Sequence, residues 1–235
     1  MTGGVQAVAA GGSSACAIVN GGAKCWGRNT VGQLGNNSTT DSVVPVTVSG
    51  QTVGGQKISV GGQTACLISN GGLRCWGAGT SGNLGNAGAT DSHVAAGVVL
   101  NLGATEIGVG DNHACAVAAG AASCWGNNLN GQLGNNSITQ RLIPVSVTGL
   151  TTAVLTGSVG VGHACAIVNG GSQCLGSNTY GALGDNSNTS SLVPVKSSGL
   201  SKLMKIASGL NHTCAIEDGA AKCWGSNSIG QLGDN

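Results

Sequence analysis

The stretch "CAIVNGGAKCWG" (Cys16–Gly27) recurs five times in this chain of 235 residues. The later copies are "CLISNGGLRCWG" from Cys66, "CAVAAGAASCWG" from Cys115, "CAIVNGGSQCLG" from Cys165 and "CAIEDGAAKCWG" from Cys214. Each copy has a glycine turn midway between two cysteines. Asn-Gly is the strongest two-residue hairpin signal, because both central positions of a type I′ turn need a positive φ. The repeated stretch therefore predicts a β-hairpin.

The spacing of the cysteines follows from that turn. With Asn20-Gly21 at the tip, Cys16 faces Cys25 as a non-hydrogen-bonded pair, where Cα atoms approach to about 4.5 Å. A disulfide tolerates that distance, and ten cysteines form five such pairs with none left over. Reduced thiols and zinc are the alternatives, but the spacing lacks the close Cys-x2–4-Cys of structural zinc sites. We predict no metal and five disulfides: Cys16–Cys25, Cys66–Cys75, Cys115–Cys124, Cys165–Cys174 and Cys214–Cys223.

The repeat has a period of 50 or 49 residues. A glycine lies five positions before each first cysteine, and a "GxLG" follows each hairpin. Short strand signals such as "KISV" (Lys57–Val60) recur four times per repeat, which is the content of one propeller blade. We predict an all-β fold: a single β-propeller domain, 1–235, of four-stranded blades, with a β-solenoid as the competitor. The repeats are approximately 1–50, 51–100, 101–149, 150–199 and 200–235.

The fifth copy stops at "GQLGDN", whereas earlier copies continue to "VPVTV" or its equivalent. We therefore expect a truncated last blade, and an incomplete ring or part of a larger propeller. An unpaired blade edge favours self-association.

Composition excludes several functions. Charged residues make up 7% and the formal net charge is +1, whereas nucleic-acid binders usually carry a strong basic excess. No apolar run approaches the ~20 residues of a membrane span, so we expect neither nucleic acid binding nor membrane insertion. No signal peptide is visible in "MTGGVQAVAAGG", which leaves a mature or trimmed form, or a protein that is not secreted.

Three stretches carry a family resemblance: "GNNSITQRLIPVSVTGL", "VGVGHACAIVNGGSQCLG" and "IASGLNHTCAIEDGAAKCWGSNSIGQLGDN". They resemble the regulator of chromosome condensation repeat, with its His-x-Cys/Ala-apolar segment, Gly turn, Trp-Gly and Gly-Gln-Leu-Gly. The resemblance implies a β-propeller, most often of seven blades, and the cysteine pair looks like the variant of secreted bacterial members. Leu175 replaces Trp in the fourth copy, and Gly157 replaces an apolar residue. We expect the fourth blade to be the loosest.

The resemblance also implies activities, which do not transfer directly. The best-known family activity is nucleotide exchange on a small nuclear GTPase with chromatin docking. This chain has only nine Lys and Arg and no insertion in its repeats that could act as a wedge, and disulfides argue against the nucleus. Secreted relatives that bind other proteins, including an inhibitor of β-lactamases, are the closer analogy.

No catalytic motif is present, so we predict a non-enzyme without cofactors. The carboxylates Asp41 and Asp91 occupy equivalent loop positions, as do Asp185 and Asp234, which points to loop capping. The histidines are also in register, beside tight turns, and we expect them to hydrogen-bond neighbouring backbone. They are His113, His163 and His212.

Residues that vary between copies are more informative about binding. Our candidates lie just before the "GxLG" glycine or just after Trp-Gly: Arg28, Val31, Leu129, Tyr180 and Ile229. Large side chains on exposed loops are where a partner is recognised, although filling gaps between blades is the alternative. We expect an extracellular or cell-surface module that binds a protein or surface glycan. The alternative is a structural repeat module of a larger extracellular protein or a self-associating fibre.

Overall fold

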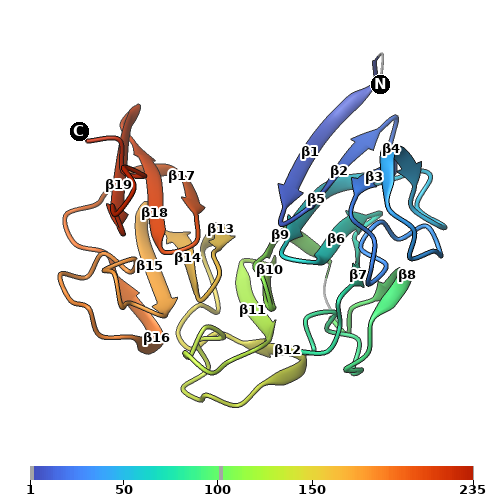
Figure 1. Ribbon diagram of the computed structural model, residues 1–235. Coiled ribbons are helices and arrows are strands. Elements are labelled where there is room, and N and C mark those ends of the chain that lie inside the picture. Colours follow the sequence, from blue (N-terminus) through green and yellow to red (C-terminus); the bar gives the residue numbers. More distant parts are fainter. Residues whose placement is uncertain (1–2, 101–102, 235) are drawn as a thin grey trace.

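The computed structural model describes residues 3–100 and 103–234, and the described chain is built from strands (Figure 1). The first sheet holds β1 (Val5–Gly11), β2 (Ser14–Val19), β3 (Gly22–Gly27) and β4 (Ser42–Thr47). The second holds β5 (Gly55–Gly61), β6 (Thr64–Ser69), β7 (Gly72–Gly77) and β8 (Ser92–Gly97). The third holds β9 (Ala104–Val109), β10 (His113–Ala118), β11 (Ala121–Gly126) and β12 (Arg141–Ser146).

The fourth sheet holds β13 (Val154–Val159), β14 (His163–Val168), β15 (Gly171–Gly176) and β16 (Ser191–Lys196). The fifth holds three described strands, β17 (Leu203–Ser208), β18 (His212–Glu217) and β19 (Ala220–Gly225). Strands in every sheet follow chain order and pair antiparallel. Each sheet is one blade, numbered here from 1 to 5.

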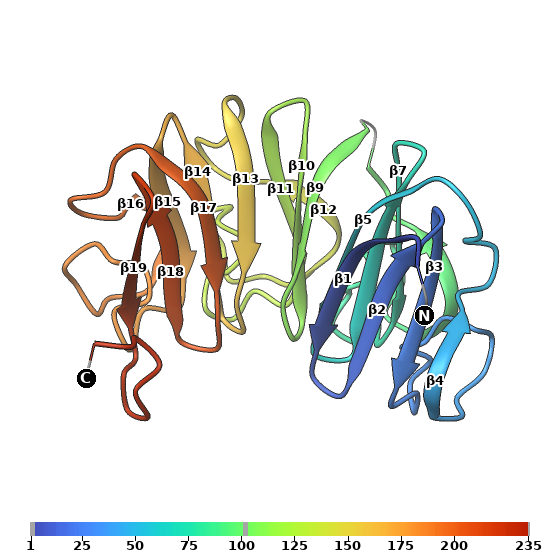
Figure 2. The same ribbon diagram turned by 90° about the horizontal axis from the view of Figure 1, so that it is seen from above.

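The blades stand side by side in an open arc (Figures 1 and 2). The first strands of successive blades, β1, β5, β9, β13 and β17, contact one another along the inner side. Blades 1 and 5 form the two ends of the arc, and the ring is not closed. The predicted propeller architecture is thus confirmed, and its competitor, a solenoid of continuous sheets, is excluded by the separate antiparallel sheets.

The hairpins have the predicted register. Asn20 and Gly21 have φ values of 50° and 78°, as a type I′ turn requires, and Cys16 pairs with Cys25. Their Cα atoms lie 4.0 Å apart and the sulfur atoms are bonded. The other four predicted pairs are also disulfides. In the described residues, no cluster of three His, Cys, Asp or Glu side chains could hold a metal ion.

The hydrophobic core lies between blades rather than within them. The disulfide face of blade 1, with Ile18 and Leu34, packs against Leu67 and Trp76 of blade 2. At the following junctions the disulfide face of one blade likewise packs against the opposite face of the next blade. A chain with no Phe therefore fills its interior with aliphatic side chains, disulfides and tryptophan.

Glycines set how closely the blades approach at the inner side. Gly11, Gly61 and Gly160 end or follow the first strand of their blades. A Cβ on Gly11 would lie 2.5 Å from the Val60 carbonyl oxygen, and one on Gly160 would lie 2.5 Å from that of Gly209. This contact explains the glycine that occurs five residues before each first cysteine.

The histidines do not behave as predicted. His163 Nε2 lies 2.9 Å from the hydroxyl of Thr213 in the next blade, rather than from backbone. His113 is fully buried, and neither ring nitrogen has a hydrogen-bonding partner among the described residues. Its ring instead packs beside Gly110. The expectation of a peg for neighbouring backbone was wrong, because the backbone atoms of each turn already bond one another: Gly110 N donates to His113 O.

Candidate binding face

One face of the arc carries a long loop from every blade. Each third strand ends at a glycine with positive φ, such as Gly27 or Gly126, and the loop begins there. Gly27 pairs with Ser14 at the start of the second strand, so this loop face lies opposite the Asn-Gly hairpin tips. The loops cover residues 28–41, 78–91, 127–140, 177–190 and the described part of 226–235.

A buried asparagine organises the loop of blade 1. The side-chain amide of Asn29 donates to the carbonyl oxygens of Ser38 at 2.9 Å and Thr40 at 3.0 Å. Its Oδ1 accepts from the backbone N–H of Leu34 at 2.9 Å. One fully buried amide thereby ties both halves of the loop together. Asn128 and Asn178 make the equivalent bonds in blades 3 and 4.

Carboxylates complete the loops, as the sequence predicted. Asp41 accepts from the backbone N–H of Asn29 at 2.7 Å, and Asp91 accepts from that of Gly79 at 2.9 Å. Asp185 accepts from the Asn178 amide at 3.0 Å. Desolvation acts to raise the pKa of Asp185, but hydrogen bonds from Ser187 and Asn178 outweigh it and the pKa is lowered. These carboxylates hold the loops through hydrogen bonds, as loop capping requires.

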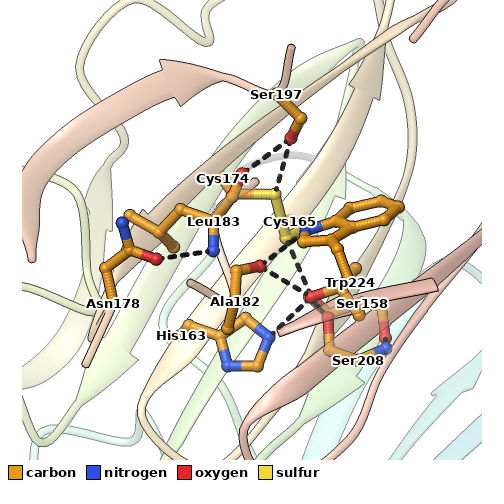
Figure 3. The surroundings of a disulfide bond; sticks show 11 residues. Ser158, His163, Cys165, Cys174, Asn178, Ala182, Leu183, Ser197, Ser208 and Trp224 are labelled. Carbon is orange, nitrogen blue, oxygen red and sulfur yellow. Dashed lines mark hydrogen bonds between the residues drawn. A yellow bond between two sulfur atoms is a disulfide. The ribbon is translucent and has the colours of Figure 1, made fainter. Parts of the chain in front are cut away.

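In blades 2, 3 and 5 a tryptophan docks the blade onto the loop of the blade before it. Trp76 Nε1 donates to the Gln33 carbonyl oxygen at 3.0 Å, and Trp125 does the same to Asn83 at 3.0 Å. The last of these bonds, from Trp224 to Ala182 at 2.9 Å, lies beside the Cys165–Cys174 disulfide (Figure 3). The loops of blades 1 and 4 are therefore held both by their own asparagine and by the indole of the next blade, which makes them fixed platforms.

The predicted binding residues all lie on these loops. Ile229, Leu129 and Tyr180 are 89%, 73% and 56% exposed. Arg28 is exposed and Val31 is half-buried. Because they belong to blades 1, 3, 4 and 5, the structure distributes them along one face and does not gather them into a single pocket. The backbone N–H groups of Val31 and Ile229 are held by the Gln33 and Gln231 side chains, which fixes these tips.

Sequence reasoning missed the asparagine organisers. They occur two residues after Trp-Gly or Leu-Gly in four repeats, in "GRN", "GNN" and "GSN". That register was the available signal, but Gly79 interrupts it in the second repeat. An Asn in a loop is ordinarily exposed, and the sequence does not show that this one is buried.

The fold and its loop face define a class: an open arc of β-propeller blades that presents loops from a rigid frame. The family model of the regulator of chromosome condensation (RCC1) repeat matches residues 20–68, 120–167 and 174–216, more than half of the chain. The chain belongs to this repeat family. A comparison with curated protein sequences found no match.

Solved structures show the same fold. Human WBSCR16 has a TM-score of 0.85 and 22% identity, over 97% of this chain and 63% of that one. Yeast RCC1 (Prp20), in its complex with Kap60, has a TM-score of 0.81 and 20% sequence identity. The match covers 95% of this chain and 56% of Prp20. The ectodomain of the receptor kinase CR4 from Physcomitrella patens has a TM-score of 0.59 and 20% sequence identity. The match covers 94% of this chain and 53% of that ectodomain. The chain thus spans less than two thirds of each of these proteins.

Proposed function

We propose that this chain is a non-enzymatic binding module that acts outside the cell and holds a protein partner on its loop face. The observation that carries the proposal is the contrast within each loop. Buried asparagines fix the loop frames of blades 1, 3 and 4 in nearly identical form, whereas the exposed tips differ from blade to blade. Rigid frames with varied tips lower the entropy cost of binding and leave specificity to the tips.

The chemistry of the tips favours a protein over a surface glycan. Leu129 and Ile229 are aliphatic, and Tyr180 is the only tyrosine of the chain. Sugars are commonly bound by stacking on aromatic rings, and Tyr180 is the only aromatic residue among the five candidates. Apolar side chains held on a fixed frame are suited to an apolar patch of another protein.

The disulfides and the structures of a family member support the proposal. Five disulfides suit an oxidising compartment. The described part of the chain holds no helix with the length and hydrophobicity to cross a lipid bilayer. The yeast family member Prp20 is seen bound to Kap60 in one crystal structure, and another is described together with its binding to Gsp1p and histones. Those partners are partners of Prp20. A nucleosome is not the partner we propose for this chain, because its net charge is only +1.

Site-specific photo-cross-linking tests the proposal. A photoreactive amino acid at position 129 or 180 is expected to give a discrete protein adduct in extracellular fluid of the source. The same probe at Leu155 is the matched control, because this leucine is 65% exposed and lies near the hairpin end of blade 4. Equal adducts at all three positions would contradict a specific face.

Salt provides the second test. Recognition through Leu129 and Tyr180 depends mainly on apolar burial and shape, so affinity should change little between 0.05 and 0.5 M salt. A steep loss of affinity over this range would indicate a charged ligand and would overturn the proposed mode of binding.

A further inference from the structure

Three hairpin tips, in blades 1, 2 and 4, carry the same two residues, Asn-Gly. The asparagines have nearly equal φ values, of 50°, 50° and 51°, and all three are exposed. Blades 1 and 4 even share the seven residues "CAIVNGG", from Cys16 and from Cys165. Any difference in the chemistry of these two tips must therefore come from the residues packed against them. The tips are Asn20-Gly21, Asn70-Gly71 and Asn169-Gly170.

An Asn-Gly pair undergoes a reaction between its own atoms. The backbone nitrogen of the glycine gives up its proton and attacks the side-chain carbon Cγ of the asparagine. A C–N bond forms, and the side-chain nitrogen takes up a proton and leaves as ammonia. Water then opens the resulting five-membered succinimide at one of its two carbonyl groups, which gives aspartate or isoaspartate. The reaction needs a free glycine N–H and a mobile asparagine amide, and glycine favours it because no Cβ shields the nitrogen.

In blade 1 both reacting groups are held. The side chain of Gln6 accepts a hydrogen bond from Gly21 N at 2.6 Å, so the attacking nitrogen keeps its proton. The Asn20 side chain lies against Gly4, where an added Cβ would collide with Asn20 Oδ1. The backbone N–H of Asn20 also donates to Gly4 O at 2.8 Å. This tip is therefore protected from the reaction.

Blade 2 has the same contacts in a looser form. Gln56 accepts from Gly71 N at 3.4 Å, beyond the usual range of an N–H···O hydrogen bond. Asn70 lies against Gly54, which again has no Cβ in the way, and Asn70 N donates to Gly54 O at 3.1 Å. Protection of this tip should be weaker than in blade 1.

Blade 4 has lost both protective contacts. Leu155 is the bulged residue of the first strand, where blades 1 and 2 have Gln6 and Gln56, and its hydrocarbon side chain accepts no hydrogen bond. Ala153, with a φ of 60°, replaces the glycine that precedes this strand, so a methyl group fills the place of the asparagine amide. Among the described residues, none accepts a hydrogen bond from Gly170 N.

We infer that Asn169 is a site of spontaneous deamidation in the folded protein. Gly170 N attacks Asn169 Cγ, ammonia leaves, and water opens the succinimide to aspartate or isoaspartate at position 169. The contacts set an order of reaction rates in which Asn169 is fastest, Asn70 is intermediate and Asn20 is slowest.

The modification changes a tip that holds two blades together. Gly170 O accepts a hydrogen bond from Leu203 N of blade 5 at 2.8 Å. Isoaspartate adds a methylene group to the backbone of a two-residue turn, whose geometry depends on its exact length. Amide hydrogen exchange at Leu203 should therefore become faster as the protein ages. The hairpin tips lie opposite the loop face, so this site stands or fails independently of the proposed function.

Peptide mass spectrometry after timed incubation tests the inference on the 235-residue chain. The samples are reduced and digested in acid, which stops further deamidation, and isoaspartate is counted with an isoaspartyl methyltransferase and labelled S-adenosylmethionine. We expect Asn169 to deamidate severalfold faster than Asn20 in the folded chain. In the reduced, denatured chain the two rates should become similar, because the sequence around the two sites is the same.

Variants at exposed positions separate the two protective contacts. Leu155→Gln restores the hydrogen-bond acceptor and Ala153→Gly restores the space, and the double variant should slow Asn169 to the rate of Asn20. Gln6→Leu is the reverse control and should accelerate Asn20 alone. Leu155 is 65% exposed and Gln6 is exposed, so neither change disturbs the core.

Three results would overturn the inference. The first is equal deamidation of Asn20 and Asn169 in the folded chain. The second is an Asn169 that stays intact in the folded chain while the denatured chain reacts. The third is a double variant in which Asn169 reacts as fast as in the unmodified sequence, since the contacts would then have no part in the rate.

Discussion

The junction between blades 1 and 2 and the junction between blades 3 and 4 perform the same task with different side chains. In the first, Trp76 is fully buried, donates to Gln33 O and packs beside Gly35. In the second, Leu175 occupies the equivalent place and packs beside Gly134. Leucine fills part of the space but has no N–H to donate, so the loop of blade 3 lacks the bond that fixes the loop of blade 1.

A second substitution widens the difference. Ile58 packs into the first junction, whereas Gly157 holds that position in blade 4. A cavity of about 30 Å³ lies between blades 3 and 4, lined by Gly157, Leu175, Val117 and other apolar residues. The comparison shows that the fold accepts Leu175 in place of tryptophan and Gly157 in place of isoleucine at one junction, with a cavity left in the packing there.

The largest expected effect comes from breaking the stronger junction. Trp76→Ala removes a buried indole and its hydrogen bond, and should lower the free energy of unfolding by about 4 kcal/mol. Leu175→Ala removes a smaller side chain beside an existing cavity and should cost about 2 kcal/mol. Urea denaturation followed by circular dichroism measures both. Equal losses would show that the two junctions do not differ in strength.

Acid should weaken blades 3 and 4 and leave blade 2 unaffected, because Thr64 stands where they have His113 and His163. Burial, and then the nearby imidazole of His163, lowers the pKa of His113 to about 3. Burial, and then His212, lowers the pKa of His163 to about 4. The unfolded chain takes up these protons near pH 6.5, so stability is full above pH 6.5 and is lost as pH falls toward 4 and 3.

The expected loss is about 1.4 kcal/mol per pH unit for each histidine within its window. His113→Thr, which copies blade 2, should remove its share of the pH dependence. Denaturation midpoints between pH 7 and pH 5 measure this. A variant with an unchanged slope would place the titrating group elsewhere.

These particular residues show how far sequence could predict the molecule. Hairpins, disulfide pairs and blades follow from local turn chemistry at Asn20-Gly21 and from a period of about 50 residues. The loop carboxylates followed from their register. The burial of Asn29 did not, because it depends on a loop folding back over its own amide. The unpaired ring of His113 could not be predicted either, because contacts between blades determine it.

Restoring tryptophan at position 175 should strengthen the weaker junction. The indole would pack beside Gly134. The Gln132 carbonyl oxygen is equivalent in the repeat to the oxygens that accept hydrogen bonds from Trp76 and Trp125. One hydrogen bond and added apolar burial should raise the free energy of unfolding by about 1–2 kcal/mol. Trp125→Leu is the reverse control and should lower it by a similar amount. Destabilisation by both changes would mean that blade 4 has repacked around its leucine.

The smallest expected effect comes from filling the cavity at its glycine. The φ of Gly157 is not positive, so an L-residue fits the backbone conformation there. A Cβ there would lie 4.0 Å from the Ala166 Cβ and 3.3 Å from the Cys165 carbonyl oxygen, a tight contact that a shift of a few tenths of an ångström would relieve. Gly157→Ala should raise the free energy of unfolding by about 0.5–1 kcal/mol, because alanine restricts the unfolded chain and covers part of the cavity wall.

The matched control is Gly108→Ala on the opposite wall, where a Cβ would lie 2.8 Å from Val159 Cγ2 and force that side chain to move. Opposite signs in the urea midpoints are expected. If both alanines destabilise the chain, the space beside Gly157 is needed for packing, and the difference between the two junctions rests on Leu175 alone.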